Sequence, residues 1–178
     1  TLGGASPTGY GIYTQKNDTN SVYLGSAYLF LATNKSLFEL RKKEIIDLDY
    51  DSVRELKIEK HGGSPLLFAK HDNIFELLSL GNQTDQGKVA DFFTELNHLR
   101  PDAFLDPPHN EDLTKLFKKR SYAFKVEWTS ATSPTKKVLK FLMDDSNELL
   151  ATFDQTKLVY KVPITFVESL NKTKEDFM

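Results

Sequence analysis

The sequence predicts a mainly β protein: an antiparallel β-barrel or sandwich capped by one amphipathic helix, followed by a second, smaller antiparallel β module. Three patterns predict this fold class. Before residue 84, about seven short apolar segments are separated by turn residues roughly every 8–12 residues, as in antiparallel sheets. From Thr84 to Arg100 the apolar residues take helical spacing instead. Beyond residue 116 the alternation of apolar and polar residues that is typical of strands returns.

The first part of the chain is rich in aromatic and β-branched residues, which favour strands. Residues 1–7 are expected to be a flexible lead-in, and Gln15–Asn20 is a polar turn. We expect four strands here: Gly9–Thr14, Ser21–Thr33, Ser36–Arg41 and Glu44–Leu48.

Three further strands are expected before the helix, at Val53–Glu59, Leu66–Lys70 and Asn73–Leu80. The segment His61–Pro65 contains two glycines and a proline, which indicates a turn. The dipeptide His71-Asp72 is expected to join the last two strands as a hairpin.

The helix is expected over Thr84–Arg100. Its residues Val89, Phe92, Phe93 and Leu96 follow the spacing i, i+3, i+4, i+7 and therefore share one face. A side-chain oxygen of Thr84 or Asp85 can cap the start, and Pro101 ends the helix. We expect the Phe-rich face to close the open end of a strongly bent sheet.

The second half is expected to form a separate domain at 117–170, after a linker at 101–116 that holds one helical turn at Leu113–Phe117. The polar residues 171–178 are expected to be a tail. Five strands are expected between linker and tail: Tyr122–Trp128, Val138–Met143, Glu148–Phe153, Lys157–Val162 and Ile164–Val167.

The segments Tyr28–Leu40 and Ile45–Val53 carry a Thr-Asn-Lys turn, an apolar strand and the spaced residues Leu48, Tyr50 and Val53. These features resemble the pleckstrin-homology (PH) superfold, closest to its GRAM and bacterial PH-like branches. The resemblance covers about residues 8–100 and implies a barrel whose C-terminal helix is Gln86–Arg100. It also implies a module of a kind that typically binds a phosphoinositide or a protein segment and rarely catalyses a reaction. The second half is then either a partial second PH-like module or an unrelated β module.

Composition excludes several classes of function. The 23 Lys and Arg nearly balance the 25 Asp and Glu, so the chain has no general attraction for nucleic acid. It has no Cys, hence no thiolate nucleophile and no Cys-ligated metal, which fits a reducing cytoplasm or a disulfide-poor bacterial exterior. No apolar run approaches the roughly 18 residues of a membrane span. We expect a cytoplasmic location, either free or peripheral to a membrane.

No catalytic, metal or cofactor motif is recognisable. Asp47, Asp49 and Asp51 resemble the start of a calcium loop, but Ser52 and Ile58 stand where that loop requires Gly and Glu. The four His are scattered, and no phosphate loop or dinucleotide fingerprint occurs. The sequence therefore predicts a protein that is not an enzyme and that needs no cofactor or metal.

Two functions remain open. The first is a scaffold or binding module that engages a protein partner through an exposed edge strand or a groove, with four basic residues at one rim: Arg41, Lys42, Lys43 and Lys57. The alternative is a peripheral membrane module that binds anionic lipid, such as a phosphoinositide. Its candidate residues are Lys118, Lys119, Arg120, Lys136 and Lys137.

Overall fold

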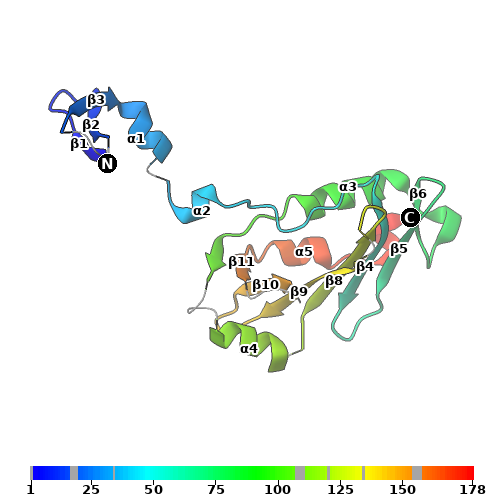
Figure 1. Ribbon diagram of the computed structural model, residues 1–178. Coiled ribbons are helices and arrows are strands. Elements are labelled where there is room, and N and C mark those ends of the chain that lie inside the picture. The colour runs from blue at the N-terminus through cyan, green and yellow to red at the C-terminus, as the bar shows by residue number, and fades with distance from the viewer. Residues whose placement is uncertain are drawn as a thin grey trace. The chain divides into compact units, whose positions relative to one another are not determined.

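The chain folds as two compact units, Thr1–Lys42 and Lys43–Met178, which we describe separately. The structure is a computed structural model that describes residues 2–16, 20–33, 35–106, 111–119, 121–133, 135–153 and 158–178 (Figure 1). Both units contain antiparallel sheets, so the protein is mainly β, as predicted.

The first unit is a three-stranded sheet of order β1-β2-β3, followed by two short helices. Its elements are β1 (Leu2–Ala5), β2 (Gly11–Gln15), β3 (Val22–Ser26), α1 (Ala27–Thr33) and α2 (Leu37–Leu40).

Three expectations for this unit are wrong. The lead-in at 1–7 contains β1, which pairs with β2. The strand expected over Ser21–Thr33 ends at Ser26 and becomes α1. The strand expected over Ser36–Arg41 is α2, because Ser36 and Glu39 form a capping box: the Ser36 hydroxyl accepts from the Glu39 N–H, and the Glu39 carboxylate accepts from the Ser36 N–H at 2.8 Å.

The second unit contains an eight-stranded antiparallel sheet of order β6-β5-β4-β8-β9-β10-β11-β7. Within the described residues the sheet is open, with β6 and β7 at its edges, and does not close into the expected barrel. Its strands are β4 (Val53–Lys60), β5 (Leu66–His71), β6 (Ile74–Leu77), β7 (Ala103–Leu105), β8 (Phe124–Ser130), β9 (Lys137–Met143), β10 (Leu149–Phe153) and β11 (Val159–Val162). Its helices are η1 (Gly81–Gln83), α3 (Gln86–Asn97), α4 (Glu111–Lys119), α5 (Phe166–Leu170) and η2 (Lys174–Phe177).

The pairing of β4 with β8 joins the two segments, 8–100 and 117–170, that were expected to be separate domains. Leu56 lies opposite Trp128 and Ile58 opposite Val126, and all four side chains are buried in one core. The expected linker at 101–116 contributes β7, which pairs with β11. The chain therefore divides at Lys42, and not between an 8–100 domain and a 117–170 domain. The physical reason is that the pairing gives both strands a neighbour and lets one core bury both inner faces.

The inner face of this sheet is covered by α3 and α5, and α4 lies on the opposite side (Figure 1). The apolar face predicted for the helix is buried at Val89, Phe92, Phe93 and Leu96. The cap is Asp85, whose carboxylate accepts from the N–H groups of Gly87 and Lys88 at 2.8 and 3.1 Å. The helix thus occupies most of the predicted range, but it packs on the face of an open sheet.

The segment before β4 forms no strand, although a strand was expected over Glu44–Leu48. Ile45, Ile46 and Leu48 are nevertheless buried. The amide of Asn97 in α3 replaces a neighbouring strand: its Oδ1 accepts from the Leu48 N–H at 2.7 Å and its Nδ2 donates to the Leu48 carbonyl at 2.8 Å. A side chain therefore satisfies backbone groups that a strand would otherwise satisfy.

The C-terminal residues are part of the core. Residues 164–167, expected as a strand, lead into α5, and the expected polar tail ends in η2. Phe177 is only 2% exposed, and its ring centroid lies 5.0 Å from that of Phe68 and 5.2 Å from that of Phe92. The Asp85 N–H donates to the Phe177 carbonyl at 2.9 Å, which fixes the chain end beside the start of α3.

Candidate functional site

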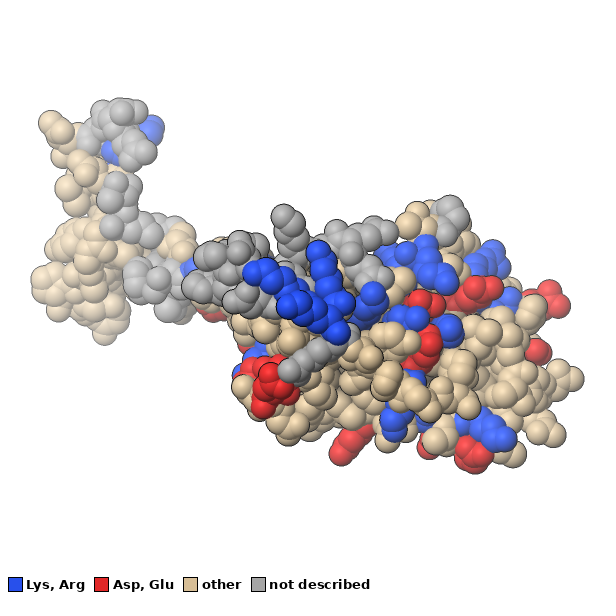
Figure 2. Space-filling model, turned by 90° about the horizontal axis from the view of Figure 1, so that it is seen from below, with Lys and Arg blue, Asp and Glu red and all other residues tan. Residues whose placement is uncertain are grey.

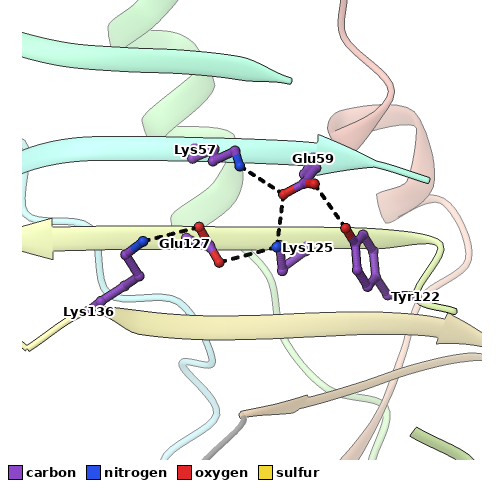
Figure 3. A network of polar contacts seen from close by, with 6 residues as sticks. All are labelled: Lys57, Glu59, Tyr122, Lys125, Glu127 and Lys136. Carbon is purple, nitrogen blue, oxygen red and sulfur yellow. Dashed lines mark hydrogen bonds and ion pairs between the residues drawn. The ribbon is translucent and has the colours of Figure 1, made fainter. Parts of the chain in front are cut away.

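The outer face of the eight-stranded sheet, opposite the core, carries a network of charged side chains centred on Glu59 (Figure 3). Glu59 of β4 lies opposite Lys125 of β8, with their charged groups 2.9 Å apart. Lys57 approaches the same carboxylate at 3.0 Å, and the Tyr122 hydroxyl donates to it at 3.0 Å. Three donors thus converge on one carboxylate.

The network continues to Glu127, which is only 14% exposed at its side chain. Lys125 lies 3.3 Å from this carboxylate and Lys136 lies 3.5 Å from it (Figure 3). Lys125 therefore bridges two carboxylates on neighbouring strands. Such cross-strand pairs of opposite charge stabilise a sheet.

Glu59 and Lys125 stabilise each other's charged forms. The bond from Lys125, followed by that from Lys57, holds the pKa of Glu59 at about 2. The bond to Glu59 in turn raises the pKa of Lys125. A general acid or base works best with a pKa near the working pH. This arrangement therefore suits a structural role for the pair better than proton transfer.

A basic pocket of about 360 Å³ opens beside this network, at the C-terminal end of α4. Lys118 and Lys119 come from the last turn of α4, and Lys140 comes from β9. Figure 2 shows Lys and Arg side chains gathered on the face that carries α4. The described lining residues are Phe117, Lys118, Lys119, Ser121, Tyr122 and Lys140. Three of these described residues are basic and none is acidic.

A second pocket, of about 490 Å³, lies between the β4–β5 hairpin and the chain end. Ile58, Leu66 and Leu170, all buried, contribute to its lining, with Lys60 at one side. Lys60 donates to the Asn171 side chain at 2.6 Å, which ties the hairpin to the C-terminal segment across the opening. This pocket is therefore the junction between the β4–β5 hairpin and the C-terminal segment.

The first unit presents an apolar sheet face. Tyr13 of β2 lies directly opposite Leu24 of β3, so both side chains project from the same face, and Val22 lies two residues away on that face. They are 43%, 65% and 63% exposed. Ile12, on the other face, is buried. Contiguous apolar surface of this kind is typical of binding sites.

One comparison with known proteins identifies a family. The profile of the family described as "Domain of unknown function (DUF4340)" matches residues 1–119, which is 119 of the 178 residues. The chain belongs to the DUF4340 family. The match spans the first unit and the second unit through α4, and β8–β11 follow it. No curated protein and no solved structure matches the chain.

The four basic residues predicted to line a protein-binding rim do not form one cluster within the described residues of this DUF4340 chain. Arg41 and Lys42 belong to the first unit, and Lys43 and Lys57 belong to the second. Lys57 pairs with Glu59 in the network. The structure therefore supports no joint site for these four.

The basic residues predicted for lipid binding are partly gathered. Lys118 and Lys119 line the basic pocket, while Arg120 lies outside the described residues. Lys136 pairs with Glu127, and Lys137 lies 5.7 Å from the Trp128 ring centroid.

Sequence reasoning missed Lys140 and the apolar β2–β3 face of this DUF4340 chain. Lys140 joins the pocket only through the register of β8 and β9, which places it opposite Lys125. The apolar alternation around Tyr13 and Leu24 was visible in the sequence, but alternation alone does not tell which face lacks a cover.

The acidic triplet does not form a metal site. Asp49 accepts from the Asp51 N–H at 3.2 Å and closes a turn. Across the described part of the chain, no group of three or more His, Cys, Asp or Glu could hold a metal ion. Nor does any described helix have the length and apolar character needed to cross a membrane.

Proposed function

We propose that this chain is a non-enzymatic binding module that engages a protein partner through the apolar face of β2 and β3. The observation that carries the proposal is the exposure of Tyr13, Val22 and Leu24 side by side on one sheet face. Removing such side chains from water stabilises a complex by about 25 cal/mol per Å² of apolar area.

The chemistry of the face favours an apolar partner surface. The other β2 and β3 residues on this face are Gly11, Gln15 and Ser26, none of which is charged. A charged ligand would gain no pairing there. Aromatic residues such as Tyr13 are enriched at the centres of protein interfaces.

The edge of the same sheet supports an extended segment as the occupant. β3 is an outer strand in the order β1-β2-β3, and Val22–Ser26 contains no Pro and no charged residue. Natural sheets use proline and charged residues on their edge strands to prevent the addition of another strand. We infer that a partner strand with alternating apolar residues pairs with β3 and covers Leu24 and Val22.

We retain in this proposal the function that the resemblance to the PH superfold implies for residues 8–100. Modules that resemble this superfold bind protein segments and rarely catalyse reactions. The ion pair between Glu59 and Lys125 fits a structural role within this proposal, because the Glu59 carboxyl group stays ionised far below neutral pH.

A capture experiment with a matched control tests the proposal. The native chain, Leu24→Lys and Leu37→Lys are immobilised and exposed to an extract of the source cells. Leu37 is 61% exposed in α2 and lies off the β2–β3 face, so its substitution adds the same charge elsewhere on the unit. We expect a protein that the native chain and Leu37→Lys retain and that Leu24→Lys loses.

Equal retention by all three chains would contradict the proposal. Concentration-dependent dimerisation of the native chain, abolished by Leu24→Lys, would also contradict it, because the occupant would then be a second copy.

A further inference from the structure

The basic pocket beside α4 is independent of the apolar β2–β3 face. We propose that it binds a phosphate group, presented by a soluble phosphomonoester or by a lipid headgroup. Three ammonium groups line it, from Lys118, Lys119 and Lys140, and no described lining residue is acidic.

The register of the outer face places like charges together at this point. Lys125 lies between Glu59 on β4 and Lys140 on β9, directly opposite each. Directly opposed like charges destabilise a sheet unless a counter-charge lies nearby. Lys125 is directed to its two carboxylates, at 2.9 and 3.3 Å, and these supply the nearby counter-charge.

Both carboxylates of the neighbouring network already have basic partners. Glu59 is bonded by Lys57, Lys125 and Tyr122, and Glu127 is paired with Lys125 and Lys136. Within the described residues, no ion pair joins Lys118 or Lys119 to a carboxylate. An anion entering the pocket would therefore displace no described carboxylate from either lysine.

The remaining lining atoms suit a phosphate ester. The Ser121 hydroxyl is a donor, and several donors can share the oxygens of a tetrahedral dianion. Phe117 and Tyr122 supply ring surfaces for the organic part of the ester. The volume of about 360 Å³ falls in the range of small-ligand pockets.

The test measures the binding of phenyl phosphate, the soluble probe, by calorimetry and by backbone amide shifts in two-dimensional NMR. We expect saturable shifts in residues 117–122 and 140. The variants Lys140→Gln and Lys118→Gln/Lys119→Gln should each weaken binding by about tenfold or more. Lys118 and Lys119 are exposed on a helix, so their variant keeps the test valid should Lys140→Gln fail to fold.

The matched control is Lys172→Gln/Lys174→Gln, which removes two charges at the second pocket. It should leave binding unchanged. Equal weakening by this control would show that net charge alone attracts the probe, and would overturn the proposal.

A vesicle arm separates the two sources of phosphate. Phosphatidylcholine vesicles with and without phosphatidylinositol 4-phosphate are sedimented with the native chain and with the Lys118→Gln/Lys119→Gln variant. Binding only to the phosphoinositide vesicles, lost in the variant, identifies a headgroup. Binding of phenyl phosphate without vesicle binding identifies a soluble ester. The absence of both kinds of binding overturns the proposal.

Discussion

Glu59 and Lys125 face each other across the strand pair that unites the two halves of the second unit, with their charged groups 2.9 Å apart. Both side chains are largely shielded, at 24% and 17% exposure, so water screens their attraction only partly. Substitutions in this pair therefore test the pairing of β4 with β8.

Replacing Glu59 by Gln should lower the free energy of unfolding by about 1–2 kcal/mol, because Lys57 and Lys125 lose a charged partner. Trp128, the only tryptophan, is buried in β8, so its fluorescence during urea unfolding measures the stability of this unit. Glu175→Gln is the control, since Glu175 is 63% exposed and 3.9 Å from Lys174. An equal loss in both variants would contradict the assigned role of the network.

The contribution of Glu59 should depend on pH with a defined sign. Its folded pKa, about 2, lies below the ordinary value of 4.5, so the stabilisation is present above pH 4.5 and disappears as the pH falls toward 2. The difference in unfolding free energy between the native chain and Glu59→Gln should therefore shrink over this range. Urea titrations of both chains at several pH values measure it, and a difference independent of pH would be inconsistent with the pair.

Phe177→Ala should destabilise the second unit by about 3–5 kcal/mol, the usual cost of truncating a buried aromatic side chain. The ring is packed between Phe68 and Phe92, and a cavity would remain. Met178→Ala, next in the chain and 55% exposed, should change stability by less than about 0.5 kcal/mol. If Phe177→Ala were as stable as Met178→Ala, the C-terminal segment would not belong to the core.

Asn97→Ala should lower the unfolding free energy by about 2–3 kcal/mol, because both backbone groups of Leu48 lose their partner beside buried side chains. The control is Thr94→Ala on the same helix, whose hydroxyl bonds only the Ala90 carbonyl one turn back. Urea unfolding followed by Trp128 fluorescence measures both. Equal stability of the two variants would argue against the anchoring role of Asn97.

Local patterns predicted the regular elements of the second unit well. The Phe-rich spacing of α3 and the hairpin of β5 and β6 depend on neighbours in sequence, and the structure confirms both, although the turn is Asp72-Asn73, one residue later than predicted. Of the two predicted caps, Thr84 and Asp85, the structure uses Asp85. The residues Asp72 and Asn73 adopt positive φ, as a tight hairpin turn requires.

Contacts between distant segments could not be predicted. No local feature of Leu56 or Trp128 reveals that β4 pairs with β8, so the sequence suggested two domains where one sheet exists. Phe177 looked like part of a polar tail, because its partners Phe68 and Phe92 lie far away in sequence. The apolar residues Leu37 and Leu40 predicted a strand where α2 forms, although Ser36 and Glu39 have the spacing of a capping box.

The same limit applies to the candidate sites. Lys118 and Lys119 stood out as neighbours in sequence, whereas Lys140 required the register of β9. Arg41, Lys42 and Lys43 formed a basic run, but a run of charges does not by itself define a pocket.

The most direct test of the proposed function is site-specific photocrosslinking in the source cells, with p-benzoylphenylalanine at position 24 or at position 37. We expect an adduct of discrete mass, formed between position 24 and a different protein, and no such adduct from position 37. The same adducts from both positions, or none from position 24, would contradict the claim that the β2–β3 face binds a protein partner.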